Sequence, residues 1–494
     1  MKRTTLCLLL MISLGATAQQ WEWAKLVHFN LPTSIDVSQV RIAPDKQGNF
    51  YLSYFHWDSN YGYPDGSAIG KYDSSGNEIW QKVFTSMLRI NDIVADHSGA
   101  LYVTGDFRDT VYIDDTSLVS NGQNDAFFAK FDEHGDLQWT KTSGGIYNDA
   151  GGGLWIDSKN NVFLTGEYSD SAFFYGNWIS QDISRYTVSK FDPAGNLLFS
   201  VSDTSGQNWS RGDKITVDNL GNIFVLGACR GGTGGASFMC MLDGLGKFKW
   251  ENRATTSIER YHDFFVDDNK NLFVTGDGSW THGSWTITDR LDSTGNKIWD
   301  KSCELNCGYY GDGGLNSITN NAGDLITLGY SNCHGLLLVK YGPEGNMIYL
   351  DTIPAVSYVR GMCIRKDSEG KYLTSGFIQG SIKLGSDSLY CSTTNIFIAR
   401  FSDKVLSSSI EKQDPNCEIN IFPNPTSGIC TIEFSSCIIP SDIIIRNTMG
   451  EYLFQKRGAL NARQEIDLSI HPKGVYFIEL VASGKRITKK IILE

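Results

Sequence analysis

In four of the segments that connect one group of predicted strands to the next, an aromatic residue stands two to four positions before an aspartate. The eight residues are Tyr147, Asp149, Trp209, Asp213, Tyr261, Asp263, Tyr310 and Asp312. An aromatic ring stacks on the apolar C–H face of a sugar, a carboxylate accepts hydrogen bonds from sugar hydroxyls, and the same pair attracts a cation. We therefore predict that these side chains form a ligand site. The alternative is that each aspartate bonds backbone amides while the aromatic ring packs inside the fold.

The chain around these pairs is repetitive. One signature consists of an aspartate, two turn residues, a glycine, three further residues and an aromatic. It reads KYDSSGNEIW up to Trp80, and it recurs with the same spacing up to Trp139, Phe199, Trp250, Trp299 and Tyr349, with Gly342 replacing the aspartate in the last copy. Aspartate accepts backbone hydrogen bonds in such turns and glycine tolerates a positive φ. Each copy therefore predicts a tight turn followed by a strand.

A second signature precedes each copy, as in DHSGALYVTG from Asp96. Similar stretches start at Asp157, Asp218 and Asp268, and diverged ones start at Asp45, Asn320 and Asp367, which makes seven units. Each unit reads as four strands joined by two tight turns and a variable loop. Four-stranded units of about 50–60 residues that stack radially form a β-propeller, whereas the repeats of a linear β-solenoid are usually shorter.

The first residues of the mature chain complete this pattern. The seventh unit ends at IFIARFSDKV from Ile396 and lacks the tryptophan strand, whereas WAKL from Trp23 matches WQKV from Trp80. We therefore predict an all-β fold in which residues 19–405 form a seven-bladed propeller, closed by an N-terminal strand that covers the open edge of the last blade. A stray N-terminal strand would leave the missing tryptophan strand unexplained.

The N-terminus has the features of a secretory leader. Lys2 and Arg3 precede an apolar run from Leu6 to Leu14, and Ala16-Thr17-Ala18 forms a small-x-small cleavage site, so residues 1–18 are predicted to be a signal peptide. The run is shorter than the ~20 residues of a membrane span. No later segment is predicted to span a membrane.

Charge is unevenly distributed along the chain. Residues 19–418 hold 32 basic and 48 acidic residues, whereas residues 419–494 hold nine basic and seven acidic ones. An acidic surface disfavours nucleic acid and anionic membranes as partners.

Ten cysteines follow the leader, and in an exported protein they predict disulfides. Cys229 with Cys240 and Cys303 with Cys307 are the candidate pairs. Zinc bound by Cys303, Cys307, Cys333 and His334 is the alternative, but this spacing matches no standard zinc pattern, so we predict no metal and no cofactor.

The sequence contains no catalytic constellation. Its eight histidines are scattered, and it has neither a Gly-x-Ser-x-Gly elbow nor a His-Glu-x-x-His motif. Turn chemistry explains the recurring aspartates at positions 73, 132, 192, 243 and 292. We therefore predict no catalytic residue, although a single pair of carboxylates could still act as acid and base.

The pattern changes after residue 405. Residues 406–418 read as a linker, and residues 419–494 contain alternating strands separated by Pro, Asn and Gly turns, which predicts a small β-sandwich. This tail resembles the type A sorting domain of the type IX (Por) secretion system of Bacteroidetes. The matching residues are Pro423, Asn424, Pro425, Gly428, Gly450, Gly474, Tyr476, Lys489 and Lys490. The resemblance implies passage across the outer membrane through that machinery, after which the domain is usually removed and the cargo is released or attached to the surface.

The repeats resemble the β-propeller repeats of many exported bacterial proteins, a resemblance that specifies the fold and says little about chemistry. We expect a secreted or cell-surface binding protein with a glycan or a protein as its ligand. A propeller-based carbohydrate-active enzyme (a lyase or hydrolase) and a docking scaffold are the alternatives. The blade connections opposite the tight turns vary most in length and carry the four aromatic–aspartate pairs, so we expect the ligand there, at one mouth of the central tunnel.

Overall fold

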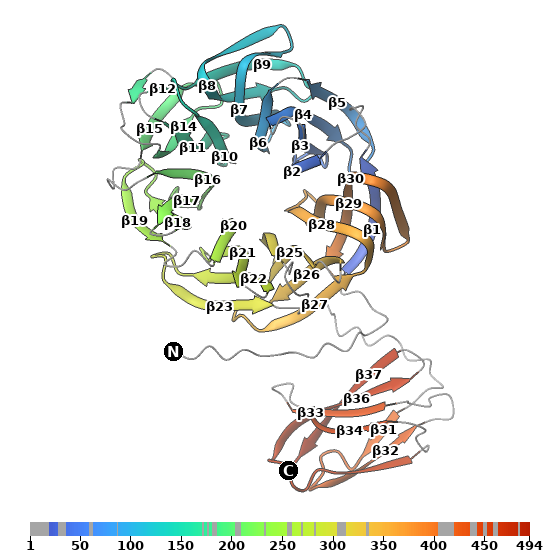
Figure 1. The fold of residues 1–494 in the computed structure, drawn as a ribbon. Coiled ribbons are helices and arrows are strands. Elements are labelled where there is room, and N and C mark those ends of the chain that lie inside the picture. Colours follow the sequence, from blue (N-terminus) through green and yellow to red (C-terminus); the bar gives the residue numbers. More distant parts are fainter. Residues whose placement is uncertain are drawn as a thin grey trace. The chain divides into compact units, whose positions relative to one another are not determined.

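The computed structural model of the chain consists of strands, turns and loops. It describes residues 19–27, 36–58, 63–85, 87–169, 172–174, 177–179, 185–202, 209–231, 234–253, 259–267, 270–280, 283–303, 313–331, 335–403, 419–434, 442–447, 452–457, 463–482 and 485–494. The chain divides into two compact units, Ala18–Asp403 and a second unit that contains Lys404–Glu494. Figure 1 shows the strands of both units.

Within its described residues, the larger unit contains seven four-stranded antiparallel sheets and one two-stranded sheet. The first three four-stranded sheets are β2 (Asp36–Pro44), β3 (Phe50–Asp58), β4 (Tyr63–Tyr72) and β5 (Glu78–Phe84); β6 (Leu88–Ala95), β7 (Leu101–Ile113), β8 (Thr116–Phe131) and β9 (Leu137–Ser143); and β10 (Ala150–Ile156), β11 (Val162–Tyr168), β14 (Arg185–Phe191) and β15 (Leu197–Ser202). The two-stranded sheet joins β12 (Ala172–Phe174) to β13 (Asn177–Ile179).

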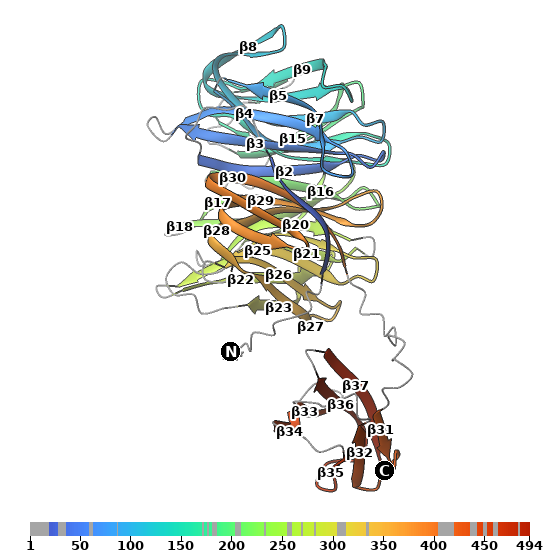
Figure 2. The same ribbon diagram turned by 90° about the vertical axis from the view of Figure 1, so that its right-hand side faces the viewer.

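The next three sheets follow the same order along the chain. They are β16 (Ser210–Val217), β17 (Ile223–Gly231), β18 (Gly234–Leu242) and β19 (Phe248–Arg253); β20 (Glu259–Val266), β21 (Leu272–Trp280), β22 (Gly283–Leu291) and β23 (Lys297–Cys303); and β24 (Gly313–Thr319), β25 (Leu325–Ser331), β26 (Gly335–Tyr341) and β27 (Met347–Ile353). The sheets are arranged around a common axis, with the first strand of each nearest to it (Figure 1). Figure 2 shows the same unit from the side.

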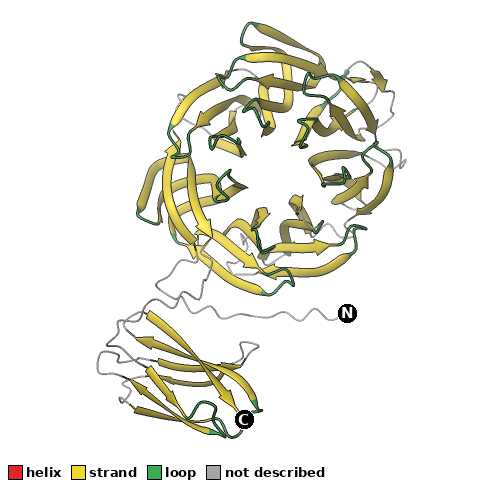
Figure 3. Ribbon diagram, turned by 180° about the vertical axis from the view of Figure 1, so that it is seen from behind, coloured by secondary structure: helices red, strands yellow, loops and turns green. Residues whose placement is uncertain are grey.

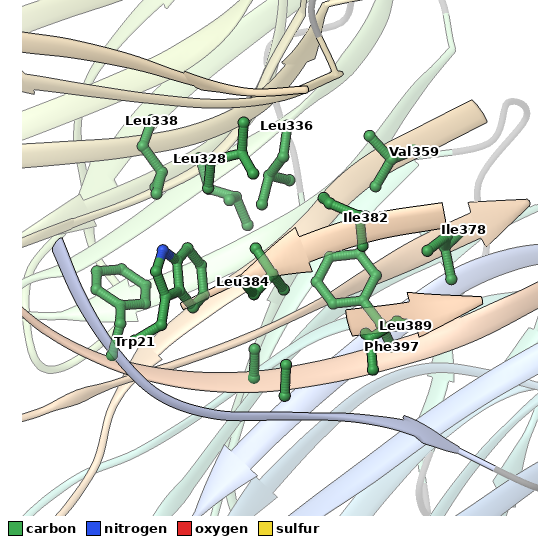
Figure 4. Packing of buried hydrophobic residues seen from close by; sticks show 14 of the residues in the cluster. Trp21, Leu328, Leu336, Leu338, Val359, Ile378, Ile382, Leu384, Leu389 and Phe397 are labelled. Atoms are coloured by element: carbon green, nitrogen blue, oxygen red, sulfur yellow. The ribbon is translucent and has the colours of Figure 1, made fainter. Parts of the chain in front are cut away.

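The remaining sheet combines both ends of the larger unit. Its strands are β28 (Ala355–Lys366), β29 (Tyr372–Leu384), β30 (Asp387–Asp403) and β1 (Gln19–Val27), and β1 pairs antiparallel with β30 at the outer edge. Trp21 is 8% exposed and packs in a cluster with Leu336, Leu338 and Leu384 (Figure 4). The strand β1 is therefore held by a full strand ladder and by core packing.

Tight turns join the first strand of each sheet to the second, and in the first six sheets they also join the third strand to the fourth (Figure 3). In the turn at Asp73, the carboxylate accepts hydrogen bonds from the backbone N–H groups of Ser75 at 2.9 Å and Asn77 at 2.8 Å. Gly76 closes this turn with a φ of 72°, a conformation that L side chains rarely adopt. These bonds account for the spacing of aspartate and glycine in the repeat.

Two sheets form the smaller unit. One contains β31 (Ile419–Phe422), β32 (Ile429–Phe434) and β35 (Arg463–Asp467), and the other contains β33 (Asp442–Asn447), β34 (Tyr452–Arg457), β36 (Gly474–Ala482) and β37 (Lys485–Leu493). Side chains from both sheets share one apolar core, which includes Ile432, Ile466, Ile445, Ile478 and Ile491.

Candidate functional site: a cavity among the inner strands

A cavity of about 400 Å³ lies among the first strands of the sheets in the larger unit. Residues of β2, β6, β10, β16, β20, β24 and β28 all contribute to its lining, and Glu167 of β11 contributes as well. Because these are the strands nearest the common axis in Figure 1, the cavity is on that axis. Its volume is within the range of ordinary small-molecule sites.

Glycines allow the inner strands β10 and β16 to approach the second strand of the preceding sheet closely. A Cβ atom on Gly151 would lie 1.9 Å from Thr104 Oγ1, and one on Gly212 would lie 2.0 Å from Thr165 Oγ1. Each glycine stands one position before a register shift of its strand, at Gly151/Gly153 in β10 and at Gly212/Lys214 in β16. These bulges turn polar residues toward the axis.

One position on the first strand of each sheet forms a ring, and three residues of this ring, Arg41, Lys214 and Asn316, line the cavity. The members of the ring stand four positions before the first turn residue of each sheet: Arg41, Asp92, Gly153, Lys214, Asp263, Asn316 and Cys363. Asp92 accepts a hydrogen bond from the Leu154 N–H at 3.0 Å, and Asn316 accepts one from the Ile364 N–H at 2.7 Å. Each therefore bonds the backbone of the next inner strand, which has no neighbouring strand on that side.

Asp92, Lys214 and Asp263 of the ring are buried, and Arg41 is partly buried. Arg41 Nε and Lys214 Nζ each lie 3.6 Å from Asp92 Oδ1. Asp263 accepts a hydrogen bond from Asn316 Nδ2 at 2.5 Å. Burial raises the pKa of Asp263 and lowers the pKa of Lys214, because removal from water disfavours both charged forms.

Ion pairs also occupy the walls of the cavity. Arg89 donates to the buried Asp106 from Nε at 2.8 Å, and Arg211 Nε lies 2.7 Å from Asp213 Oδ1. His262 lines the cavity, and its Nε2 contacts the carboxylate of Asp277. A histidine beside a carboxylate has the arrangement of a general base.

Three of the predicted ligand residues lie at or against this cavity. Asp213 and Tyr261 line it, while Trp209 donates its indole N–H to the lining residue Glu167. The guanidinium carbon of Arg211 is 5.9 Å from the centre of the Trp209 ring, so Trp209 supports the wall. The Tyr261 hydroxyl donates to Asp289 at 2.8 Å.

The other described members of the predicted set lie elsewhere. Asp263 belongs to the buried ring. Asp149 is 0% exposed and accepts backbone N–H groups of Ser169 at 2.7 Å and Gly145 at 2.8 Å, which matches the alternative predicted for these aspartates. Burial, with a smaller contribution from the nearby Asp125 carboxylate, raises the pKa of Asp149 to about 7. Tyr147, 48% exposed, stands before the first residue of β10.

Tyr310 and Asp312 lie outside the described residues, so their prediction stays open. Within the described pairs, the aspartates do not share one structural position. Asp149 stands eight positions before the turn residue Asp157, Asp213 five before Asp218, and Asp263 four before Asp267.

The sequence analysis missed the arginines of the cavity wall. Counting back seven positions from the first turn residue gives Arg89, Arg211, Arg260 and Arg360 in four of the seven sheets, and three of these four line the cavity. This count is available from the repeat alone, because the turn aspartates fix its register.

The predicted Cys229–Cys240 disulfide is wrong. Cys229 pairs with Ala236 across the β17–β18 hairpin and Cys240 pairs with Val225, so the two thiols stand four positions apart along the ladder. That offset is about 13 Å at ~3.3 Å per residue, which is beyond the reach of a disulfide. Cys307, Cys333 and His334 lie outside the described residues. Among those described, no three His, Cys, Asp or Glu side chains are placed to hold a metal ion.

In the smaller unit, the motif residues at the two ends of the domain contact each other. Asn424 donates from Nδ2 to the Lys490 carbonyl at 2.8 Å and accepts the Ile492 N–H at 2.9 Å. Tyr476 donates its hydroxyl to the Pro472 carbonyl. Of the other predicted sorting residues, Pro423, Pro425, Gly428, Gly474 and Lys489 are described, and Gly450 is outside the described residues.

Residues 420–494 match the family model of the secretion system C-terminal sorting domain. The sorting domain indicates a secreted or cell-surface protein and implies an interaction with the type IX secretion machinery. None of the described residues belongs to a helix that is long and apolar enough to cross a membrane.

The chain shows distant sequence similarity to one curated protein. An uncharacterized WD repeat-containing protein of Acanthamoeba polyphaga mimivirus is 25% identical over 132 residues, which are 24% of this chain and 9% of that protein. The chain thus spans about a tenth of the length of that curated relative.

Two solved structures are similar over most of their length. A protein of unknown function from Dyadobacter fermentans matches at 7% identity and a TM-score of 0.41, covering 79% of this chain and 100% of that one. The polysaccharide lyase Uly1 matches at 9% identity and a TM-score of 0.42, covering 75% and 89%. These likenesses carry no argument about function.

Proposed function

We propose that the protein is a secreted binding protein whose ligand occupies the cavity on the axis of the larger unit. The observation that carries the proposal is the lining of that cavity, to which the first strands of all seven four-stranded sheets contribute. In this proposal the sheets are the seven blades of a β-propeller, and β1 closes the ring by pairing with β30. The pairing of β1 at the outer edge of the β28–β29–β30 sheet supports closure.

Export in this proposal follows the type IX route of Bacteroidetes. A signal peptide over residues 1–18 takes the chain across the inner membrane, and residues 419–494 direct it across the outer membrane. The match to the sorting-domain family supports this step. The domain is then removed, and the propeller is released or attached to the cell surface.

Within the cavity, Asp213 and Tyr261 are the predicted residues that can contact the ligand, and Trp209 positions Glu167, which also lines the cavity. Tyr147, Asp149, Asp263, Tyr310 and Asp312 remain members of the predicted set. Asp149 and Asp263 are buried and bonded within the protein, so their role in binding would be indirect.

A glycan array probed with the full chain tests the proposal. We expect specific binding that is lost in Tyr261→Ala and retained in Tyr261→Phe, because phenylalanine preserves the ring that lines the cavity. Binding that both variants retain in full would place the ligand site elsewhere, and the absence of binding to any glycan would count against a glycan-binding role.

The contact between His262 and Asp277 favours a carbohydrate-active enzyme as the second candidate function. His262 lines the cavity, and its contact with the carboxylate of Asp277 orients the imidazole ring. Incubation with a bound polysaccharide and chromatography of the products distinguish the two functions. Products that form with the wild type and not with His262→Gln would establish catalysis, whereas an unchanged polysaccharide leaves binding alone.

A further inference from the structure

The lining of the cavity is basic, although the protein as a whole is acidic. Five cationic side chains line it, namely Arg41, Arg89, Arg211, Lys214 and Arg360, against the two carboxylates of Glu167 and Asp213. The chain has a formal net charge of −12. A site whose charge is opposite to that of its surroundings selects ligands by electrostatic complementarity.

Four of these cations already have carboxylate neighbours. Arg89 pairs with Asp106 and Arg211 pairs with Asp213. Arg41 and Lys214 share Asp92 in the buried ring.

Arg360 differs from the other four cations. Its guanidinium carbon lies 4.6 Å from the centre of the Tyr330 ring, and its Nε is buried without a hydrogen-bond partner. No carboxylate in the described part of the chain pairs with it. A guanidinium has five N–H donors, and a buried donor without an acceptor is costly. Arg360 therefore offers unused donors to an oxyanion in the cavity.

A second unused polar group is next to this arginine in the fold. Gln39 of β2 lines the cavity, and its Oε1 is buried without a hydrogen-bond partner. The strands β2 and β28 are neighbours, and Gln39 and Arg360 stand six and seven positions before the turns at Asp45 and Asp367. The wall thus presents a donor for an oxyanion and, beside it, an acceptor for a hydroxyl group.

We propose that the cavity binds an acidic saccharide, with its carboxylate or sulfate group on Arg360 and a hydroxyl group on Gln39. This inference rests on the proposed function and names the ligand class of the same site. The cavity, at about 400 Å³, is much larger than an inorganic anion, and Tyr261 adds an aromatic ring to its wall. Glu167 and Asp213 provide acceptors for further hydroxyl groups.

Isothermal titration of the full chain tests this inference with trigalacturonate, a sulfated chondroitin disaccharide, and neutral maltotriose. We expect binding of an acidic probe that weakens as salt is added, and no binding of maltotriose. Preference for trigalacturonate identifies the recognised group as a carboxylate, and preference for the disaccharide identifies it as a sulfate.

Arg360→Met removes the charge and keeps an extended side chain against Tyr330. It should weaken acidic-probe binding about ten- to a hundredfold, as expected for a charged hydrogen bond. Gln39→Leu should weaken it about two- to tenfold, as expected for a neutral hydrogen bond. Neither side chain has a hydrogen bond to the described residues, so both variants should fold. Lys159→Met, which removes one exposed charge from the turn after β10, is the matched control and should bind as the wild type does.

Binding of no acidic probe, equal binding of maltotriose, or undiminished binding by Arg360→Met would overturn the inference. Neutral-glycan binding that Tyr261→Ala abolishes would leave the proposed function standing without this ligand class. If no glycan on the array binds, both the glycan-binding role and this ligand class are refuted.

Discussion

The indole N–H of Trp23 donates to the backbone carbonyl of Ser74, 51 positions later in the chain, at 3.1 Å. Three internal tryptophans make the same bond to the corresponding turn of the next sheet: Trp80 to Glu133 at 3.0 Å, Trp250 to Ser293 at 3.1 Å and Trp299 to Pro343 at 3.0 Å. The N-terminal strand thus joins the last sheet to the first with the contact that joins three other pairs of neighbouring sheets.

Removing this contact should destabilise the larger unit. Trp23→Ala deletes a partly buried indole and its hydrogen bond, and we expect it to lower the free energy of unfolding by about 2 kcal/mol. Trp80→Ala, its internal counterpart, should cost a similar amount. Deleting residues 19–27 should cost much more, because the β30 ladder and the buried Trp21 are lost as well. Urea unfolding followed by circular dichroism measures all three, and a deletion that left the midpoint unchanged would rule out ring closure by β1.

The same tryptophan explains one of the repeat glycines. A Cβ on Gly76, where φ is 72°, would lie 2.7 Å from the Trp23 ring, whereas one on Gly370, where φ is 78°, would meet only the Lys366 side chain at 3.7 Å. Both Gly→Ala substitutions should lower the free energy of unfolding by about 1 kcal/mol, because alanine disfavours the left-handed backbone conformation. Gly76→Ala should lower the free energy of unfolding by at least a further ~1 kcal/mol, because the Trp23 ring must move to make room for the methyl group. Equal melting temperatures for the two variants would show that the indole does not restrict the turn.

The fold was readable from the sequence because each repeat residue has a local or periodic role. Asp73 and Gly76 shape one turn, and Trp80 contacts the turn one repeat later, so their spacing recurs in every copy. The missing strand of the last unit could be found at Trp23 for the same reason.

The cavity was much harder to predict. The aromatic–aspartate spacing grouped Asp149, Asp213 and Asp263, although these residues stand at three different distances from the first turn of their sheets. Contacts such as that of Lys214 with Asp92 cross from one sheet to another, past Gly153 on the strand between them. Such contacts depend on how neighbouring sheets pack and on the bulges of the inner strands, and these bulges have no sequence signature. The arginines seven positions before the turns could have been found in the sequence, but only by counting back from the turn aspartates.

The smaller unit allows a direct test of its part in export. Asn424 joins the segment before β32 to β37 by two hydrogen bonds, so Asn424→Ala should destabilise this domain by roughly 1–2 kcal/mol. We expect less protein in the medium or at the cell surface and more in the periplasm of a host with type IX secretion, measured by immunoblotting of cell fractions. Asn420→Ala, at an exposed position of β31, is the control and should be exported normally.

When residues 419–494 are deleted, the larger unit should remain entirely in the periplasm. Efficient release of this truncated protein into the medium would refute the sorting role of the domain.

Buried Asp149 should make the stability of the larger unit depend on pH. Its carboxyl group has a pKa of about 7 in the fold, raised by burial from the ordinary value of 3.8. The folded state therefore binds a proton that the unfolded chain releases between about pH 4 and pH 7. The resulting contribution to stability is fully present below about pH 4 and is lost as the pH rises to 7, by roughly 4 kcal/mol at most.

Asp149→Asn removes this titration and keeps the size of the side chain. We expect the free energy of unfolding of the wild type, minus that of the variant, to fall as the pH rises from 4 to 7 and to level off above pH 7. Urea titrations across this range measure the difference. Asp125 is present in both proteins, so its own titration largely cancels. Parallel profiles for the two proteins would mean that Asp149 stays ionised in the fold. The hydrogen bonds from two backbone N–H groups to its carboxylate would then outweigh the cost of burying the charge.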